Sequence, residues 1–372
     1  MKVRECGRKF ATTRAQSHTF PRHANVKLTS MHCTLLIPDL LPPHELGSEP
    51  YAGLRLAHLG TILARGNTAR HPPVTREDWL CERYGVPRQQ DLPLAALMLK
   101  ADGGGPANHY WLCADPIQLR VDRNRLIIAG RATDFSDGET RDLMAALNQH
   151  FAADGIVFCA PTPARWYLRC QRVPQLVTTP LARALNRSIK HHLPQGGDAL
   201  AWHRVMNEAQ MILHNHPVTA AREARGAAAA NSIWLWGGGA LPVIAQSHYT
   251  ATWGGDHLTH AFAIAASIAH HDLPADGTAW LATATAGYHL LELDAPANAL
   301  HAGDVTNWRT QIEALDEQWI NPLLAALRAR KIDTLTLTAC NSENLLAATA
   351  AAADMRRFWR RARPLAAYAG LA

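Results

Sequence analysis

The chain has 372 residues, of which 48% are hydrophobic and 18% charged, a composition typical of a globular protein with a large core. Lys and Arg exceed Asp and Glu by 37 to 31, and no nucleic-acid-binding fingerprint occurs, so we expect an anionic small molecule rather than nucleic acid. No apolar run reaches membrane-span length, and seven cysteines without a CxxC pair predict a cytoplasmic protein with reduced thiols and no membrane partner.

The N-terminal segment, residues 1–30, is polar and basic and lacks the apolar core of a secretory signal, which predicts a disordered basic tail. Because Met31 directly precedes a strand-like segment, translation starting at Met31 is an alternative interpretation, with the tail an overlong start. Residues 31–39 predict a buried strand that ends at Asp39, before Pro42 and Pro43. An aspartate in that place is commonly a turn former or a helix cap.

Helical spacing follows at residues 51–66, where Leu54, Leu59 and Leu63 share a face and Gly66 ends the segment. The next stretch, residues 66–87, contains no serine, and its threonines are Thr68 and Thr75. Thr75 before the sequence REDWL predicts a helix N-cap.

A glycine-rich stretch at residues 101–108 marks a linker into an inserted lobe, because strand-like and helix-like segments alternate over residues 106–195. Arg165 and Arg169 lie beside Trp166 in this lobe. They are either packing stems with solvated charges or ligands for an anion at the lobe interface. Residues 202–218 then predict an amphipathic helix.

The most informative segment covers residues 216–240. Arg222 and Arg225 precede Asn231, and the apolar run SIWLW predicts a strand that is buried on both faces and lies centrally in a mostly parallel sheet. Gly237, Gly238 and Gly239 end this strand. They are either a flexible turn or the place where backbone amides approach an anionic ligand.

This basic pair, the approach to Asn231 and the sequence IWLWGGG resemble the matching segment of the archaeal-type cofactor-independent phosphoglycerate mutases, in the alkaline phosphatase superfamily. The layout, including ADPIQL at 114–119, is also similar to a bacterial family described as mutase-like and as the regulatory protein RpfE. The resemblance implies an α/β fold with an alkaline-phosphatase-like, mostly parallel sheet flanked by helices and an inserted smaller α+β lobe. We expect the core at 31–105 and 196–345, the lobe at 106–195 and a C-terminal basic helix at 346–372.

The same resemblance implies two divalent metals, manganese or zinc, held by aspartates and histidines after the strands. Asp256, His257 and His260 offer such groups, with the two histidines at i and i+3. The alternative is that Asp256 is a helix cap with surface histidines beside it. The candidate metal ligands are therefore Asp39, Asp256, His257, His260, His301 and Asp304.

Against an active enzyme, the serine nucleophile of the resembling family is missing, and its Asp-His pair is replaced by Cys340 and Asn341. We therefore expect a degenerate relative with little phosphotransfer and a regulatory role, which binds an anionic metabolite or an acidic protein partner. The alternative is an active metal-dependent mutase or phosphohydrolase with a rearranged site. The candidate ligand-binding residues are Arg222, Arg225, Asn231, Gly237, Gly238, Gly239, Arg165 and Arg169.

Overall fold

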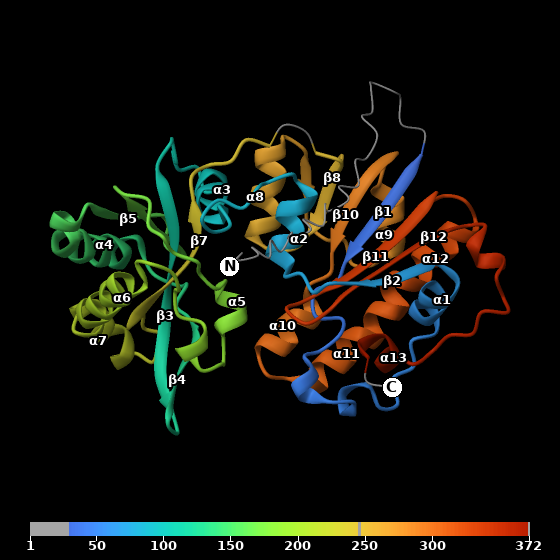
Figure 1. Ribbon diagram of the computed structural model, residues 1–372, viewed down its shortest axis with the longest axis horizontal. Helices are drawn as coiled ribbons and strands as arrows, with labels where there is room; N and C mark the ends of the chain where they lie inside the picture. The colour runs from blue at the N-terminus through green and yellow to red at the C-terminus, as the bar shows by residue number, and fades with distance from the viewer. Residues whose placement is uncertain (1–29, 245–246, 371–372) are drawn as a thin grey trace, which may run out of the picture.

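The computed structural model describes residues 30–244 and 247–370, which form two β-sheets side by side, each with its own helices (Figure 1). The expected tail at residues 1–29 lies outside the described residues. Within the described part of the chain, no helix is both long and apolar enough to cross a membrane.

The larger sheet has seven strands in the order β2-β12-β11-β1-β10-β8-β9. The five strands from β11 to β9 pair in parallel, and β12 and β2 add antiparallel pairings at one edge. The expectation of a mostly parallel sheet is confirmed. In chain order these strands are β1 (Met31–Leu36), β2 (Asn67–His71), β8 (Ala251–Gly254), β9 (Ala269–His271), β10 (Gly287–Glu292), β11 (Thr334–Cys340) and β12 (Leu345–Ala351).

Helices cover both faces of this sheet because successive strand residues point to opposite sides. Leu35 and Leu291 pack in one core, whereas their neighbours Leu36 and Leu290 belong to a second core that continues into the smaller half. The first core is completed by α1 (Ala57–Arg65), α9 (Gly277–Thr283), α11 (Val305–Leu315) and α12 (Asn321–Arg328), and the second by α2 (Arg76–Arg83), α3 (Leu94–Ala101) and α8 (His257–Ala266).

The smaller sheet is antiparallel throughout and confirms the inserted α+β lobe. Its longest strand, β3, pairs with β4, β6 and β7, and β6 pairs with β5. The strands are β3 (Tyr110–Asp122), β4 (Arg125–Arg131), β5 (Ile156–Thr162), β6 (Arg165–Cys170) and β7 (Ser232–Gly239), and the helices are α4 (Asp137–Phe151), α6 (Ala199–His214) and α7 (Pro217–Ala224).

The expected place of the apolar strand at 231–236 is wrong. This segment is β7, which pairs antiparallel with β3 in the smaller sheet and has no pairing to the described strands of the larger one. All eight residues of β7 are buried, and both α3 and α6 pack against the strand. An unalternating apolar run reports burial on both faces but not the sheet that the strand joins. We therefore propose that the lobe extends to about residue 239.

The expected C-terminal basic helix is also wrong over most of its length. Residues 345–351 form β12, and in the described residues that follow, up to 370, helix returns only in the short segments η6 (Asp354–Arg356) and α13 (Leu365–Ala369). Between them, Arg357 and Arg360 donate to the backbone oxygens of Arg65 and Gly66 at the end of α1. Pro364, which has no N–H to donate, stands directly before α13.

Candidate functional site

Four neighbouring strands of the larger sheet end beside polar side chains. Asp39 follows β1, Asp256 follows β8, Glu292 ends β10 and Asn341 follows β11. Since these strands are parallel, their carboxyl ends lie at one edge of the sheet, where ligands bind in many α/β proteins.

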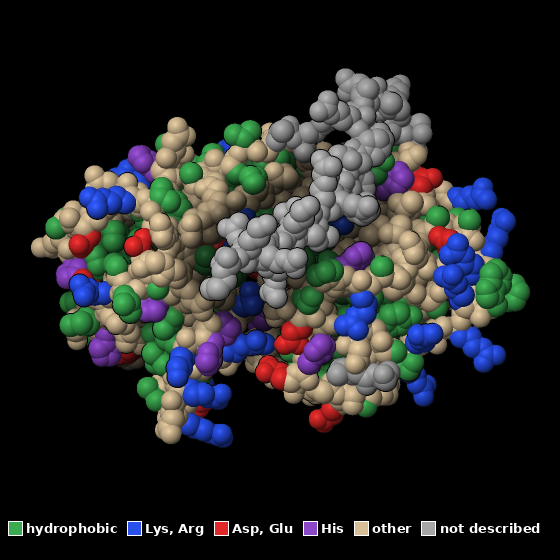
Figure 2. Space-filling model, in the orientation of Figure 1, with side chains coloured by type: hydrophobic (Ala, Val, Ile, Leu, Met, Phe, Trp, Pro, Cys, Tyr) green, Lys and Arg blue, Asp and Glu red, His purple; other side chains and the backbone are tan. Residues whose placement is uncertain are grey.

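A cavity of about 160 Å³ lies at this edge, with one wall supplied by the smaller half. That wall is the segment 182–187, which includes part of α5 (Leu181–Ala184) and bridges to β4 at Leu185. Figure 2 shows basic, acidic and histidine side chains gathered where the two halves meet. The polar lining comprises Asp39, Thr75, Arg76, Glu77, Arg183, Arg187, Asp256, Asp294, Asn298, His301, Asn341 and Ser342.

Thr75 caps α2, as the sequence predicts. Its hydroxyl accepts from the Asp78 backbone N–H at 3.1 Å and donates to the Asp78 carboxylate at 2.8 Å. Thr75 also lines the cavity, so a hydroxyl does stand near Asp39 at the start of a helix. In this structure the hydroxyl is engaged in the cap.

Arg76 is the central cation of the site, and sequence reasoning missed it. Its Nη2 donates to Asp256 Oδ1 at 2.6 Å and to Glu292 Oε2 at 3.1 Å, and its Nε donates to the other Glu292 oxygen. Burial alone would lower the pKa of this guanidinium, but the two carboxylates raise it. The only sequence signal for Arg76 is indirect. Glu292 at the end of an apolar strand needs a cationic partner when it is buried, but the sequence does not show which residue supplies it.

Asp39 and His301 face each other across the cavity, with 3.6 Å between Asp39 Oδ2 and His301 Nε2. Burial raises the pKa of Asp39 to about 6, although a hydrogen bond with Asn341 opposes this shift. Burial lowers the pKa of His301, so the imidazole is neutral at pH 7. Burial likewise raises the pKa of Glu77, which is 5% exposed and lines the same cavity.

The six expected metal ligands do not come together. Asp39, Asp256 and His301 line the cavity, whereas the other three side chains have local roles. His257 lies 3.1 Å from the Asp102 carboxylate, His260 stacks on His270, and Asp304 caps α11. Asp256 also caps α8, as the sequence predicts. Spacing at i and i+3 places the two histidines on one side of α8 but does not orient that side toward the sheet edge.

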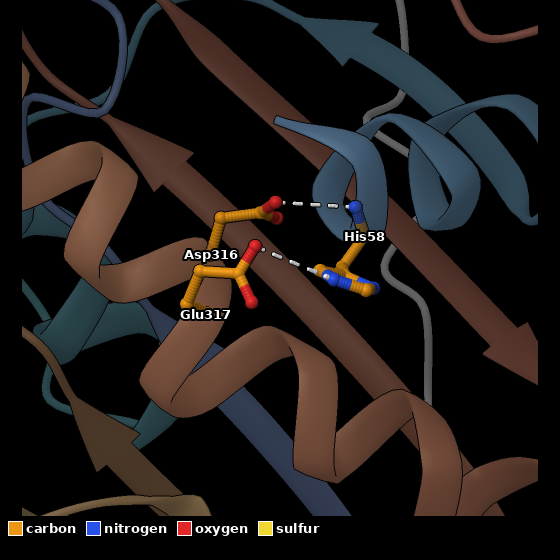
Figure 3. Close-up of side chains that lie close together, drawn as sticks. All are labelled: His58, Asp316 and Glu317. Carbon is orange, nitrogen blue, oxygen red and sulfur yellow. Dashed lines mark hydrogen bonds and ion pairs between the residues drawn. The ribbon is translucent and has the colours of Figure 1, made fainter. Parts of the chain in front are cut away.

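Among the described residues, one group of three metal-ligating side chains lies within 4.8 Å, and it is elsewhere: His58, Asp316 and Glu317 (Figure 3). Asp316 accepts from the backbone N–H groups of His58 and Leu59 at 3.2 and 2.6 Å, so it caps the start of α1. Glu317 lies 3.7 Å from the His58 ring nitrogen and is 66% exposed. The cap accounts for this group without a metal.

The expected ligand-binding arginines of α7 are structural. Arg222 is fully buried, donates to Asp134, Glu139 and the backbone oxygen of Ala228, and stacks over Phe135. Arg225 pairs with Glu139 at 2.6 Å. These arginines bind within the lobe instead of at the cavity.

Asn231 and the glycines are structural too. The Asn231 side chain exchanges two hydrogen bonds with the backbone of Leu119, so it extends the strand pairing. A Cβ atom on Gly239 would lie 2.5 Å from Pro93 Cβ, and one on Gly238 would lie 2.2 Å from the Tyr110 hydroxyl. Gly237 has a φ of 72° and donates its N–H to Thr178. The glycines permit close packing of β7 and are buried.

The two lobe arginines are also outside the cavity. Arg165 donates to Asp102, which additionally accepts from the Tyr167 hydroxyl at 2.6 Å. These hydrogen bonds lower the pKa of Asp102 despite the opposing effect of burial. Arg169 lies on β6, paired in register with Trp111 and Val157. Besides Arg76, the arginines that line the cavity are Arg183 and Arg187, at i and i+4, which the sequence analysis did not single out.

Comparison with known proteins places the central third of the chain near one family. Residues 116–219 match the family model described as 2,3-bisphosphoglycerate-independent phosphoglycerate mutase. A protein of that name from Methanothrix thermoacetophila is 31% identical over 168 residues, 41% of this chain and 43% of its own length. A probable 2,3-bisphosphoglycerate-independent phosphoglycerate mutase from Geobacter sulfurreducens is 31% identical over 158 residues, 38% of this chain and 40% of its own.

The chain thus spans less than half the length of these curated relatives. Among solved structures, the PH0037 protein from Pyrococcus horikoshii matches with a TM-score of 0.54 and 14% identity, covering 87% of this chain and 88% of that one. This likeness concerns the fold alone. The central part of the chain is therefore similar to phosphoglycerate mutases. The matched residues run from within β3 to the start of α7, so they leave out β7 and the sheet-edge residues Asp39, Arg76, Asp256 and His301.

Proposed function

We propose that this phosphoglycerate mutase-like protein is cytoplasmic and binds a phosphorylated or carboxylated small molecule in the cavity between the sheet edge and segment 182–187. The observation that carries the proposal is the pair Arg183 and Arg187 on the cavity wall. Arg183 forms no side-chain hydrogen bond or ion pair with any residue in the described ranges, and the nearest carboxylate to Arg187, that of Glu45, is 3.6 Å away. Guanidinium groups that are not engaged at short range favour bidentate binding of carboxylate or phosphate.

We further infer that phosphotransfer is weak or lost. Its support is the engaged hydroxyl of Thr75, which leaves the cavity without a free serine or threonine nucleophile at the start of α2. One observation favours the alternative of an active metal-dependent mutase or phosphatase: Thr75, Asp39 and His301 line the same cavity. A mutase and phosphatase assay with added Mn²⁺ or Zn²⁺ separates these two functions.

We also propose a regulatory role resembling that of the RpfE-like family, which would use a different surface of the molecule. Phe358 and Trp359 are 77% and 66% exposed and lie among five arginines at positions 356–363. Figure 2 shows hydrophobic side chains at the right end of the molecule with Lys and Arg side chains beside them. Exposed aromatic and arginine side chains are enriched in protein interfaces, and the positive charge favours an acidic partner.

The test of anion binding is a titration of the purified protein with 3-phosphoglycerate and, separately, with inorganic phosphate. A ligand at 100 times its Kd should stabilise the protein by about 2.7 kcal/mol, which is visible as a shift in Tm. Arg183→Ala and Arg187→Ala should each weaken binding by about tenfold or more, because each removes a charge-assisted hydrogen bond. Arg225→Ala is the matched control, since it removes a half-exposed arginine from the lobe without touching the cavity.

Retained binding in both Arg183→Ala and Arg187→Ala would overturn the cavity proposal. Loss of binding in Arg225→Ala alone would restore the α7 arginines as ligands. If neither anion binds the wild-type protein, the acidic-partner proposal is favoured instead.

A further inference from the structure

Two carboxylates lie close together at the buried end of β10, and their negative charge needs compensation. Glu292 is fully buried, and Asp256 stands beside it at the carboxyl edge of the neighbouring strand. Burying a carboxylate without a compensating cation is strongly unfavourable. The arrangement therefore requires a positive charge at this point.

Arg76 supplies that charge through one planar group. Its Nη2 lies within 3.1 Å of three side-chain oxygens, those of Asp256, Glu292 and Thr259. Thr259 in turn donates its hydroxyl to Glu292. Two carboxylates and a hydroxyl around one point form an all-oxygen donor set, the kind that hard divalent cations prefer.

The guanidinium is held there by the way α2 begins. Arg76 is the first residue of α2, directly after the Thr75 cap, and its side chain is 15% exposed. Trp79, Leu80 and Cys81 of the same helix are buried in the core, so α2 cannot withdraw the arginine without unpacking. The expected metal ligands thus do not fit a two-metal centre here, because a side-chain cation already occupies the position between Asp256, which is one of them, and Glu292.

We propose that Arg76 is a built-in cation filling a latent divalent-metal site formed by Asp256, Glu292 and Thr259. The wild-type protein does not bind a metal at this point, and removal of the guanidinium uncovers the site for a hard cation such as Mn²⁺ or Mg²⁺. The net charge explains the exchange: two carboxylates and one arginine leave one negative charge, whereas two carboxylates and one Mn²⁺ leave none. This inference does not depend on the anion proposed for the cavity.

The test compares Mn²⁺ binding to the wild-type protein and to Arg76→Ala, by electron paramagnetic resonance of bound Mn²⁺ and by calorimetric titration. Arg76→Ala should bind one Mn²⁺ with an affinity about tenfold or more above the wild-type protein, and its Tm should rise with Mn²⁺. The double variant Arg76→Ala with Glu292→Gln should lose this gain, because one carboxylate is gone. Arg183→Ala, which removes another cavity arginine but leaves both carboxylates paired, should not gain Mn²⁺ binding.

Arg76→Met covers the case in which the alanine variant does not fold, because methionine keeps an apolar stem in the same space. If both variants fold only when Mn²⁺ is present, the metal is completing the site and the proposal stands. The proposal is overturned if the folded variants gain no Mn²⁺ binding, or if neither folds with Mn²⁺ present. It also fails if the wild-type protein already binds Mn²⁺ as tightly as Arg76→Ala and loses it in Glu292→Gln.

Discussion

The carboxyl edge of the larger sheet and the glycine end of β7 both join a buried strand to a turn, yet they are built oppositely. At the sheet edge, charged groups of both signs surround a cavity. At the end of β7, Pro93, Leu94 and Tyr110 fill the space that a side chain on Gly237, Gly238 or Gly239 would need. A glycine run after a strand therefore marks close packing as readily as a ligand, and only the neighbouring elements decide between the two.

The sharpest test of this contrast is Arg222→Ala. The variant removes a fully buried cation and leaves Glu139 without one of its two arginines, so unfolding should become easier by about 3–5 kcal/mol. Urea unfolding measures this change. Arg225→Ala, whose side chain is 51% exposed, should cost no more than about 1 kcal/mol. If the Arg222→Ala protein has normal stability but no longer binds anions, Arg222 is a ligand-binding residue and not a structural one.

Asp39→Asn tests the sheet edge, and we expect this variant to gain stability where Arg222→Ala loses it. The pKa of Asp39 is about 6 in the folded protein and 3.8 for an ordinary aspartate, so this group favours folding below pH 3.8 and loses that contribution as the pH rises to about 6. At pH 8 the asparagine variant should therefore be more stable than the wild-type protein, by at most about 3 kcal/mol.

Asparagine also tolerates the φ of 54° at this position. Thermal unfolding at pH 4.5 serves as the control, because most of the difference should vanish there. A destabilised variant at pH 8 would mean that Asp39 holds a cation.

Gly239→Ala tests the glycine end of β7. Its new Cβ would lie 2.7 Å from Pro93 Cα, so the variant should lose about 1–3 kcal/mol of stability while anion binding persists. The matched control is Gly105→Ala, where no atom lies within 4 Å of the new Cβ. Equal stability of the two variants would show that packing does not require Gly239.

Thr75→Ala should have the smallest effect on stability, about 1 kcal/mol, through loss of the α2 cap. Thr75→Ser should restore stability because serine caps equally well. Any measurable mutase or phosphatase activity that disappears in Thr75→Ala and returns in Thr75→Ser would identify the hydroxyl as a nucleophile. Unchanged activity in the alanine variant would leave Thr75 with the cap alone.

Local signals in the sequence predicted local structure well. The caps at Thr75 and Asp256 and the stop at Gly66 follow from backbone N–H groups and chain ends that involve a few neighbouring residues. The mostly parallel sheet was expected from the family resemblance and from the unalternating apolar run at residues 231–236, although that run lies in the smaller sheet. Helix caps and helix ends depend on neighbouring residues and not on distant parts of the chain.

The candidate site was only partly predictable, because its charges are matched over long separations. Arg76 pairs with Glu292, which is 216 residues away, and Arg222 pairs with Asp134, 88 residues away. When these partners are unknown, an arginine near a strand is easily interpreted as a ligand-binding group. For this reason Arg222 was interpreted from the sequence as a ligand-binding residue, and Arg76 was not selected. The prediction of the sheet that β7 joins was wrong for the same reason, because nothing in the sequence of this segment indicates that it pairs with β3.

The pairing of β1 has a consequence for the order in which the chain folds during synthesis. Met31 pairs with Gly287 and His32 with Thr334, so the first strand has no sheet partners until the last third of the chain has left the ribosome. The smaller sheet, by contrast, lies within residues 110–239 and can form while translation continues. The nascent protein should therefore carry a finished lobe beside an unpaired, apolar first strand, and this interval is when a chaperone would have most to protect.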